Sequence, residues 1–518
     1  MELVVPPLPL SDVVRELPGK VTVQGDASVA VSGVRHDSRA VEPGDLFVVR
    51  KGRTSDGAKF VDAAVAKGAR ALLVQRDQTE GVATNLPMVL VDNAVQAMAY
   101  AAAAVYGHPS FSVDVVGITG TNGKTTTTHL LRGAMDRLLG KPSMGAIGTV
   151  GNVFGTERIE ATHTTPESDE LARIMAHMVR RGAAHIGMEV SSIALDLGRV
   201  DAVRFAVAAF TNLTQDHLDF HGDMDSYAAA KAKLFLDHAP GVSVVHVGDA
   251  FGASLARRLS SERVGEVVTV STQKDGDAAF RPVHFQSSMR GLVAQLHTPA
   301  GPVELRSPLV GLHNLENLLV VLGSMFALGV PITQAVQALA LETGVRGRLE
   351  RVPGTAQQPV VFVDYAHTPD ALLRVLRALR ELSPARLICV FGCGGDRDAG
   401  KRAPMGSEAG TGADVVFLTS DNPRTEDPEA IARAAELGLQ QSGKRRAASV
   451  AELASSPGYL VELDRAAAIG QAIALAGPSD IVLIAGKGHE TYQIVGTEQR
   501  HFDDVEVAAS ALRDCLGA

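Results

Sequence analysis

Residues 120–125 read Gly-Thr-Asn-Gly-Lys-Thr and follow an apolar run, Val113–Thr119. Glycines let backbone N–H groups wrap around a phosphate, and the start of a following helix adds partial positive charge. Lys124 could then reach the β- and γ-phosphates of a nucleotide, and the Thr125 hydroxyl suits Mg²⁺. The strict phosphate-loop pattern has glycine where this chain has Ile118, so the stretch is a variant loop. By itself it fits a kinase, a nucleotide switch or a ligase.

Other polar side chains follow apolar runs further along the chain. Glu189 ends one such run, and a buried acid there needs a partner or a metal. His217 follows another, and Lys231 and Lys233 lie on a helix-like segment after it. A carboxylate, a histidine and the loop threonine could hold Mg²⁺ together with phosphate oxygens. Taken singly, His217 also fits a capping histidine and Lys231 a solvated helix lysine.

The elements that would position these residues alternate between strand and helix. Apolar runs such as residues 360–364, 387–391, 415–418 and 481–485 are separated by helical segments. This alternation predicts an α/β fold with parallel sheets, in which ligands bind beyond the carboxyl ends of the strands. A length of 518 residues suggests about three domains.

Composition narrows the class of protein. The net charge is −9 and aromatic residues make up 4% of the chain, which argues against a nucleic-acid binder. Three cysteines, Cys389, Cys393 and Cys515, do not make a disulfide framework. The start of the chain lacks the pattern of a signal peptide, and the longest apolar run is too short to span a bilayer. We expect a cytoplasmic protein that does not insert into membranes and is a monomer.

Several motifs in order extend this interpretation. The loop is followed by "EVSS", "TNLTQDHLDFHG", "YAAAKAKLF" and "GLHNLENLL", and then by "VDYAHTPDAL", "FGCGGDRDAGKR", "SDNPRTEDP" and "AGKGHETYQ". The segment "DSRAVEPGDLFV" precedes the loop. Over roughly residues 30–515 the chain resembles the Mur ligase family, ATP-dependent amide ligases of peptidoglycan precursor synthesis. The variant with Ile118 is the usual form of the loop in that family.

The resemblance implies three domains. Residues 1–110 would form an α/β domain for a UDP-linked substrate, residues 111–342 a central P-loop ATPase-like domain with a parallel sheet, and residues 343–518 a Rossmann-like domain for an amino acid.

The resemblance also implies site residues. Catalytic residues would be Lys124, Lys231, Glu189 and His217, and the magnesium ligands would be Thr125, Glu189, His217 and Lys231. ATP would contact Gly120, Thr121, Asn122, Gly123, Lys124, Thr125, Thr126, Asn314, Arg348 and Asp364. The other substrates would contact His36, Ser38, Arg53, Thr54, Ser55, His163, Thr164, Thr165, Ser191, Leu197, Arg199, Arg397, Asp421, Asn422, Pro423, Arg424, Gly486 and Glu490.

Within the family the likeness points to members that add meso-diaminopimelate to the D-Glu side-chain carboxylate of UDP-MurNAc-L-Ala-D-Glu, through an acyl phosphate. Lys231 aligns with a lysine that the family carbamylates, which would turn a cation beside ATP into an oxygen ligand for Mg²⁺. Arg424 would recognise the second carboxylate that distinguishes diaminopimelate from lysine, and Glu490 its distal ammonium.

One position departs from the family, which usually has histidine where this chain has Ile193. Three alternatives stay open. A lysine-adding family member is disfavoured by "DNPR", and a folylpolyglutamate synthase by Thr125-Thr126 and the "DSR" segment. A nucleotide switch would not need Arg397, Arg424 and Glu490 together. The segment "GCGGDR" lacks the spacing of a dinucleotide-binding fingerprint.

Overall fold

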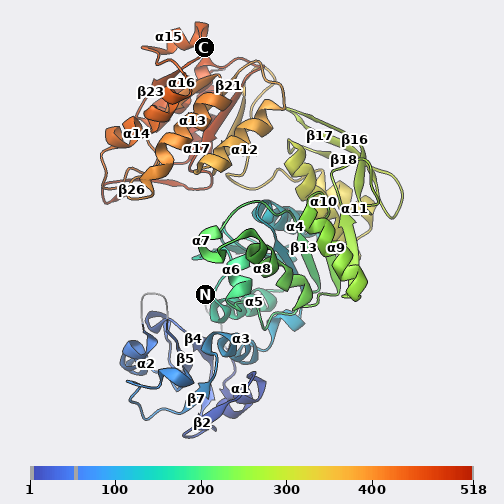
Figure 1. The fold of residues 1–518 in the computed structure, drawn as a ribbon, viewed down its shortest axis with the longest axis vertical. Coiled ribbons are helices and arrows are strands. Elements are labelled where there is room, and N and C mark those ends of the chain that lie inside the picture. Colours follow the sequence, from blue (N-terminus) through green and yellow to red (C-terminus); the bar gives the residue numbers. More distant parts are fainter. Residues whose placement is uncertain (1–4, 52–55, 516–518) are drawn as a thin grey trace. The chain divides into compact units, whose positions relative to one another are not determined.

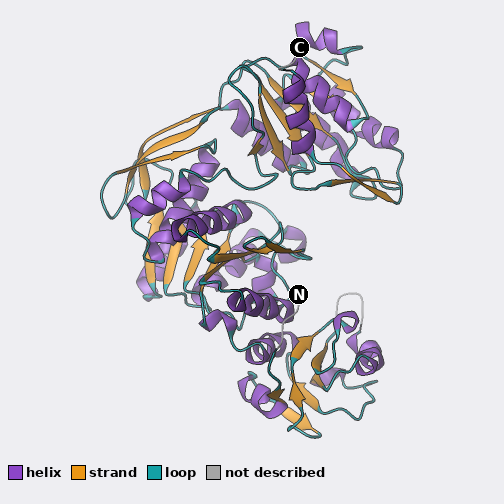
Figure 2. Ribbon diagram, turned by 180° about the vertical axis from the view of Figure 1, so that it is seen from behind, coloured by secondary structure: helices purple, strands orange, loops and turns teal. Residues whose placement is uncertain are grey.

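A computed structural model describes residues 5–51 and 56–515. The chain forms two compact units, one made mainly of residues before Leu339 and the other mainly of residues after Ala340 (Figure 1). The first unit contains a five-stranded and an eight-stranded sheet and the second contains a six-stranded sheet, each with helices packed against its strands (Figure 2). The prediction of an α/β fold is therefore confirmed.

The N-terminal sheet has five strands in the order β2-β7-β6-β5-β4, and all its neighbours pair in parallel except β2 with β7. Its strands are β2 (Thr22–Gln24), β4 (Gly33–Arg35), β5 (Asp45–Val49), β6 (Ala71–Gln75) and β7 (Met88–Val91). The short pair β1 (Leu8–Pro9) and β3 (Ala30–Val31) lies apart from it. The helices are α1 (Leu10–Glu16), α2 (Val61–Ala66) and α3 (Ala94–Val105). β5 is buried at every residue, as expected for a parallel strand covered on both faces.

The central sheet has eight strands in the order β11-β10-β9-β12-β8-β13-β14-β15, and the six from β9 to β15 are parallel. Its strands are β8 (Asp114–Thr119), β9 (Met144–Ile147), β10 (Asn152–Phe154), β11 (Glu157–Ile159), β12 (His185–Glu189), β13 (Val207–Phe210), β14 (Val242–His246) and β15 (Glu266–Val270). The helices between them are α4 (Lys124–Leu139), α5 (Ser168–Arg180), α6 (Ser192–Asp196), α7 (Leu218–His221), α8 (Met224–Leu236) and α9 (Ala250–Glu262). The carboxyl ends of β9, β12, β8, β13 and β14 therefore meet at one edge.

The chain then forms a separate three-stranded sheet and two helices. The strands of this sheet are β16 (Arg281–Ser288), β17 (Gly291–His297) and β18 (Val303–Ser307). The helices are α10 (Leu312–Ala327) and α11 (Ile332–Leu339).

The C-terminal sheet has six strands in the order β19-β20-β24-β21-β22-β23, and only β19 runs antiparallel to its neighbour. Its strands are β19 (Glu350–Arg351), β20 (Val360–Asp364), β21 (Leu387–Phe391), β22 (Val415–Leu418), β23 (Gly458–Val461) and β24 (Ile481–Ala485), and a hairpin of β25 (Tyr492–Val495) and β26 (Glu498–His501) follows. The helices are α12 (Pro369–Arg380), α13 (Arg402–Gly412), α14 (Pro428–Gln441), α15 (Val450–Ser455), α16 (Arg465–Leu475) and α17 (Asp504–Asp514).

Local sequence explains where these elements begin. The Thr368 side chain accepts a hydrogen bond from Ala371 N, and Pro369 occupies the first helical position, so α12 has a strong start signal.

Cys389 and Cys393 are free and buried, as expected for apolar core residues, and burial raises the pKa of each thiol to about 12. Within residues 5–51 and 56–515, every helix falls short of the length and apolar character that crossing a bilayer requires.

Candidate active site

The glycine-rich loop joins β8 to α4, as predicted. Gly120 has φ +148° and Gly123 has φ +85°, a region that favours glycine. A Cβ at Gly120 would lie 1.9 Å from the Thr211 hydroxyl oxygen, so the loop needs glycine for space as well. Asn212 fixes the loop from β13, because its carbonyl accepts from Thr121 N at 2.8 Å and its Oδ1 accepts from Asn122 N at 3.0 Å.

Two lysines converge on this loop. Lys124 Nζ donates to the carbonyls of Gly120 and Thr121 at 2.9 and 2.8 Å. Lys231 is 1% exposed, donates to the same Gly120 carbonyl at 2.8 Å, and lies 4.4 Å from the centre of the Tyr227 ring. Burial lowers the pKa of Lys231 well below its usual value, and the charge of Lys124 lowers it further. Lys233, by contrast, pairs with Asp196 at the surface.

Glu189 ends β12 and is 1% exposed, as expected for a buried acid at a strand end. Its carboxylate accepts hydrogen bonds from the Thr125 hydroxyl at 2.9 Å, from Thr149 N at 2.8 Å and from the Thr149 hydroxyl at 3.1 Å. Thr149, which follows the neighbouring strand β9, was not predicted from the sequence. A Cβ at Gly148 would lie 2.1 Å from Glu189 Oε1, so this glycine makes room for the carboxylate.

The four residues expected to bind magnesium lie around the loop, but not as a preformed metal cluster. Among the described residues, no three His, Cys, Asp or Glu side chains converge to hold a metal ion. Glu189 and Thr125 are in contact and offer the oxygen donors that Mg²⁺ prefers. His217 follows β13 in a left-handed conformation, φ +53°, and its ring packs edge-on against Tyr227, the same ring that Lys231 contacts. This donor set fits a cation whose other ligands come from phosphate oxygens.

The residues expected to contact the sugar and peptide lie next to Glu189. The Thr165 hydroxyl donates to the Glu189 carbonyl at 2.9 Å and accepts from Ser191 N at 3.0 Å. Thr164 lies 3.1 Å from the Thr149 hydroxyl, and Arg199 donates to the Thr165 carbonyl at 3.0 Å.

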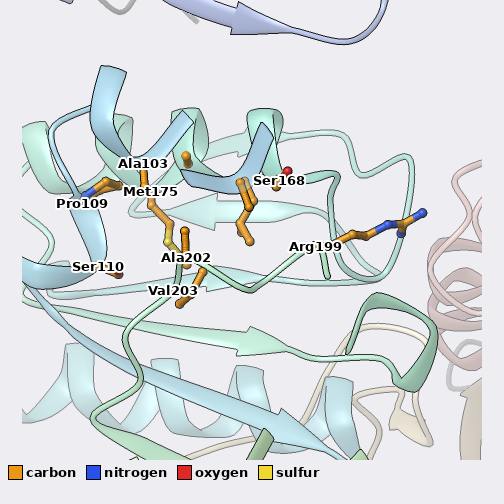
Figure 3. Close-up of a pocket in the computed structure, with 11 residues that line it drawn as sticks. Ala103, Pro109, Ser110, Ser168, Met175, Arg199, Ala202 and Val203 are labelled. Carbon is orange, nitrogen blue, oxygen red and sulfur yellow. The ribbon is translucent and has the colours of Figure 1, made fainter. Parts of the chain in front are cut away.

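Two further residues of this group, His163 and Leu197, are exposed. Ile193 lies in α6 beside Ser192, whose hydroxyl oxygen is 2.9 Å from His221 Nε2. Figure 3 shows Arg199 extending away from a small apolar cavity between α3 and α5. The volume of this cavity is about 20 Å³, which is room for one water and not for a substrate.

Charged contacts surround the predicted N-terminal site residues. His36 Nδ1 lies 2.8 Å from the carboxylate of Asp169, at the start of α5. Glu167 pairs with Arg199 at 2.6 Å and with Arg50 at 2.9 Å. Neither acid was predicted from the sequence. Ser38 begins a short 3₁₀ turn after His36, whereas Arg53, Thr54 and Ser55 lie outside the described residues.

The remaining predicted nucleotide contacts lie in α4, in α10 and in the C-terminal unit. Thr126 lies in the first turn of α4. Asn314 donates to the Val310 carbonyl at 2.9 Å, whereas Asn317, one turn later in α10, is the residue that contacts Thr127 of α4, at 3.4 Å. In the C-terminal unit, the Asp364 carboxylate accepts from Leu349 N and Ala366 N, and burial raises the pKa of Asp364.

Next to Asp364, Arg348 stacks over Tyr365 at 5.2 Å. This arginine therefore lies close to the end of β20, where Asp364 is located.

The predicted amino-acid residues gather at the carboxyl ends of β21, β22 and β24. Arg424 has φ +52° and donates to the Gly395 carbonyl at 2.8 Å. Glu490 accepts from the Asn422 amide at 2.9 Å. A Cβ at Gly394 would lie 3.1 Å from Arg424 and 3.8 Å from Arg397, so the side chains of both arginines lie close to Gly394.

Three more residues of the predicted amino-acid site, Asp421, Pro423 and Gly486, lie at the same carboxyl ends of β22 and β24. Pro423 is buried between Asn422 and Arg424. A Cβ at Gly486 would lie 2.7 Å from the Asp421 carboxylate, so the loops after β22 and β24 are in close contact.

Together, a phosphate loop with a buried acid and lysine and a separate Rossmann-like domain are typical of a nucleotide-dependent enzyme. Family models agree: residues 30–106 match the "Mur ligase family, catalytic domain", residues 118–325 the "Mur ligase middle domain", and residues 347–488 the "Mur ligase, glutamate ligase domain". The chain belongs to the Mur ligase family.

The most similar relatives make the comparison more specific. The UDP-N-acetylmuramoyl-L-alanyl-D-glutamate–2,6-diaminopimelate ligase of Chromobacterium violaceum is 44% identical over 93% of this chain and 94% of its own length. The ligase of the same name from Trichormus variabilis is 42% identical over 94% of this chain and 95% of its own. A solved structure of a ligase with this name is 32% identical, with a TM-score of 0.69 over 94% of this chain and 96% of that one.

Proposed function

We propose that this chain is an ATP-dependent amide ligase that adds meso-2,6-diaminopimelate to the D-Glu side-chain carboxylate of UDP-MurNAc-L-Ala-D-Glu, in peptidoglycan precursor synthesis. The observation that carries the proposal is the grouping of Arg424, Asn422 and Glu490 at one edge of the C-terminal sheet. An arginine and a carboxylate suit a ligand that bears both a carboxylate and an ammonium at its far end. The names of the relatives support the same substrates.

ATP binds at the loop between β8 and α4 in this proposal. The backbone N–H groups of residues 120–126 and the start of α4 receive the phosphates. Lys124 moves from the Gly120 and Thr121 carbonyls to the phosphates, which offer a stronger charged partner. The family resemblance also assigns nucleotide contacts to Asn314, Arg348 and Asp364.

Lys231 is carbamylated by CO₂ in this proposal. Its burial and lowered pKa favour the neutral amine, which is the form that attacks CO₂. The amine nitrogen bonds to the carbon of CO₂ and releases one proton, and the carbamate that forms carries negative charge, which attracts Lys124 and a divalent cation. With Glu189, His217 and Thr125, it would hold Mg²⁺, which offsets charge on the phosphates when bound.

The reaction then has two steps. The D-Glu carboxylate oxygen attacks the γ-phosphorus of ATP, and ADP leaves, which gives an acyl phosphate. The amine of diaminopimelate attacks the acyl carbon, loses a proton and expels phosphate, which carries away one carboxylate oxygen. Lys124 stabilises the charge that develops on the transferring group, and positioning of the reactants supplies much of the rate.

The UDP-linked substrate lies along the N-terminal and central sheets in this proposal. His36 and Ser38 contact the uridine, with residues 53–55 beside them. Thr164, Thr165, Ser191 and Arg199 contact the sugar and peptide, together with His163 and Leu197. The domain boundaries near residues 110 and 342, the cytoplasmic location and the monomeric state belong to the same proposal.

The proposal is tested by measuring phosphate release with ATP, Mg²⁺ and UDP-MurNAc-L-Ala-D-Glu while the amino acid is varied. We expect release that depends on meso-diaminopimelate and is at least about tenfold slower with L-lysine, because lysine leaves Arg424 without a carboxylate. Release that is faster with L-lysine, or indifferent to the amino acid, would show that the substrate is assigned wrongly.

A further inference from the structure

Lys487 is a completely buried lysine in the turn that follows β24. Its Nζ lies 3.0 Å from Asn422 Oδ1, 3.4 Å from Glu490 Oε2 and 3.7 Å from Asp421 Oδ1. It also lies 5.6 Å from the centre of the Tyr492 ring. Every oxygen among these contacts belongs to a residue that the proposed function places at the amino-acid site.

The charge of Lys487 is balanced inside the protein. A buried ammonium is costly unless it is paired and hydrogen-bonded. Burial lowers the pKa of Lys487, whereas the carboxylates of Asp421 and Glu490 oppose that shift. Burial raises the pKa of Asp421, and the positive charges of Arg465 and Lys487 oppose it. Asp504 also acts on this cluster and forms a buried pair with Arg465 at 2.7 Å. Tyr365 and His367 face the same carboxylates from the loop after β20.

Lys487 also decides which way the Asn422 side chain points. An ammonium donates and never accepts, so the Asn422 atom facing it must be the amide oxygen. The same oxygen accepts from Ile494 N at 3.0 Å. The amide nitrogen is therefore directed to Glu490 Oε2, at 2.9 Å. Lys487 thus holds both the amide of Asn422 and the carboxylate of Glu490.

A second buried cation, Arg465, fixes the backbone of the loops that follow β22 and β24. Arg465, at the start of α16, donates to the Ala485 carbonyl at 3.0 Å and to the Ser420 carbonyl at 3.4 Å. Ser420 precedes Asp421, and Ala485 precedes Gly486. The two loops are therefore joined through their backbones by Arg465 and through their side chains by Lys487.

We propose that Lys487 is a positioning residue for amino-acid specificity: it holds the Glu490 carboxylate, directly and through the Asn422 amide, in the orientation that receives the distal ammonium of the incoming diamino acid. Because Lys487 is buried, it acts through these two side chains and does not touch the ligand. The inference rests on the proposed function.

The test compares Lys487→Met with the matched variant Lys444→Met. Lys444 Nζ donates to the carbonyls of Ala413 and Asp414, which precede β22 at the opposite end of the same sheet. Lys487→Met is expected to raise the KM for meso-diaminopimelate at least about tenfold, the size of one lost charged hydrogen bond. The KM values for ATP and the UDP-linked substrate stay within about twofold, and Lys444→Met changes none of the three.

A double variant separates positioning from general support of the fold. Lys487→Met in a Glu490→Gln background removes both partners of the pair, which also relieves the buried charge if the single variant folds poorly. If Lys487 acts through Glu490, its substitution adds less than about threefold to KM in that background. In the single variant the acidic limb of kcat/KM moves to higher pH, because Asp421 loses a cation that opposes its raised pKa. A lysine that only supported the fold would affect KM to the same extent with and without Glu490→Gln, so the double variant decides between the two roles.

The outcomes distinguish this inference from the proposed function. If the unmodified protein adds no diaminopimelate, the proposed function is wrong. If the unmodified protein adds it, and Lys487→Met folds and keeps its KM, the inference alone is overturned. Equal effects of Lys487→Met on all three KM values, or full additivity with Glu490→Gln, would also overturn it.

Discussion

Gly148→Ala tests the importance of the buried Glu189 carboxylate without changing any charged group. The new Cβ would lie 2.1 Å from Glu189 Oε1 and 2.7 Å from its carboxyl carbon. Glu189 is held by hydrogen bonds from Thr125 and Thr149 in a buried site. The carboxylate must therefore move, and at least one of these bonds breaks.

The size of the effect follows from those bonds. A hydrogen bond to a charged group contributes about 1.5–3 kcal/mol, and each 1.36 kcal/mol corresponds to a factor of ten. Loss of one bond to Glu189 in the transition state therefore lowers kcat/KM roughly 10- to 150-fold. Crowding of a packed interior costs a further ~1–3 kcal/mol of folding free energy, so the melting temperature falls as well.

The assay is ATP-dependent phosphate release with all substrates present, together with thermal melting. Gly470→Ala is the matched control, because a Cβ there meets nothing within 4 Å and alanine favours helix α16. The control should keep full activity and melt at the same or a higher temperature. A Gly148→Ala protein that is folded and fully active would refute the role given to Glu189.

Three further predictions concern other parts of the site. Lys231→Ala should be nearly inactive and partly rescued by small carboxylates such as formate in the phosphate-release assay; unrescued full activity would remove the carbamate from the mechanism. Arg424→Lys should raise the KM for diaminopimelate at least about tenfold and leave that for ATP unchanged, because an ammonium cannot replace the planar fork; an unchanged KM for diaminopimelate would show that Arg424 is not the clamp. Burial by itself would lower the pKa of His36, but the contact with Asp169 raises this pKa above its usual value. The contact therefore stabilises the fold at low pH, and this stabilisation is lost as the pH rises through the folded-state pKa of His36. The difference in melting temperature between the unmodified protein and Asp169→Asn should thus shrink from pH 6 to pH 8, and a constant difference would contradict the assignment.

The sequence was most informative where one short segment determines a structure. The loop at residues 120–125 lies between a strand and a helix, as predicted, because its glycines and the apolar run before it act locally. Glu189 was singled out because it is a polar residue at the end of an apolar strand, where ligands of parallel sheets bind, whereas Asn422 was named only through the family resemblance. The motifs of the Mur ligase family supplied the order of the domains.

Other residues depend on neighbours that are distant in the sequence. Thr149 meets Glu189 because β9 lies beside β12, a strand order that a threonine after a short apolar run does not reveal. Asn212 and Asn317 contact the phosphate loop and its helix in the same way. Lys487 was not singled out from the sequence, and only the packing of two loops shows that it is buried among acceptors.

The most direct test of the proposed chemistry is oxygen transfer from the substrate. UDP-MurNAc-L-Ala-D-Glu labelled with ¹⁸O in the D-Glu side-chain carboxylate is incubated with ATP, Mg²⁺ and meso-diaminopimelate, and the phosphate and product are examined by mass spectrometry. An acyl phosphate requires one ¹⁸O in the released phosphate and one in the new amide. Phosphate without label, or a product without diaminopimelate joined to D-Glu, would contradict the account.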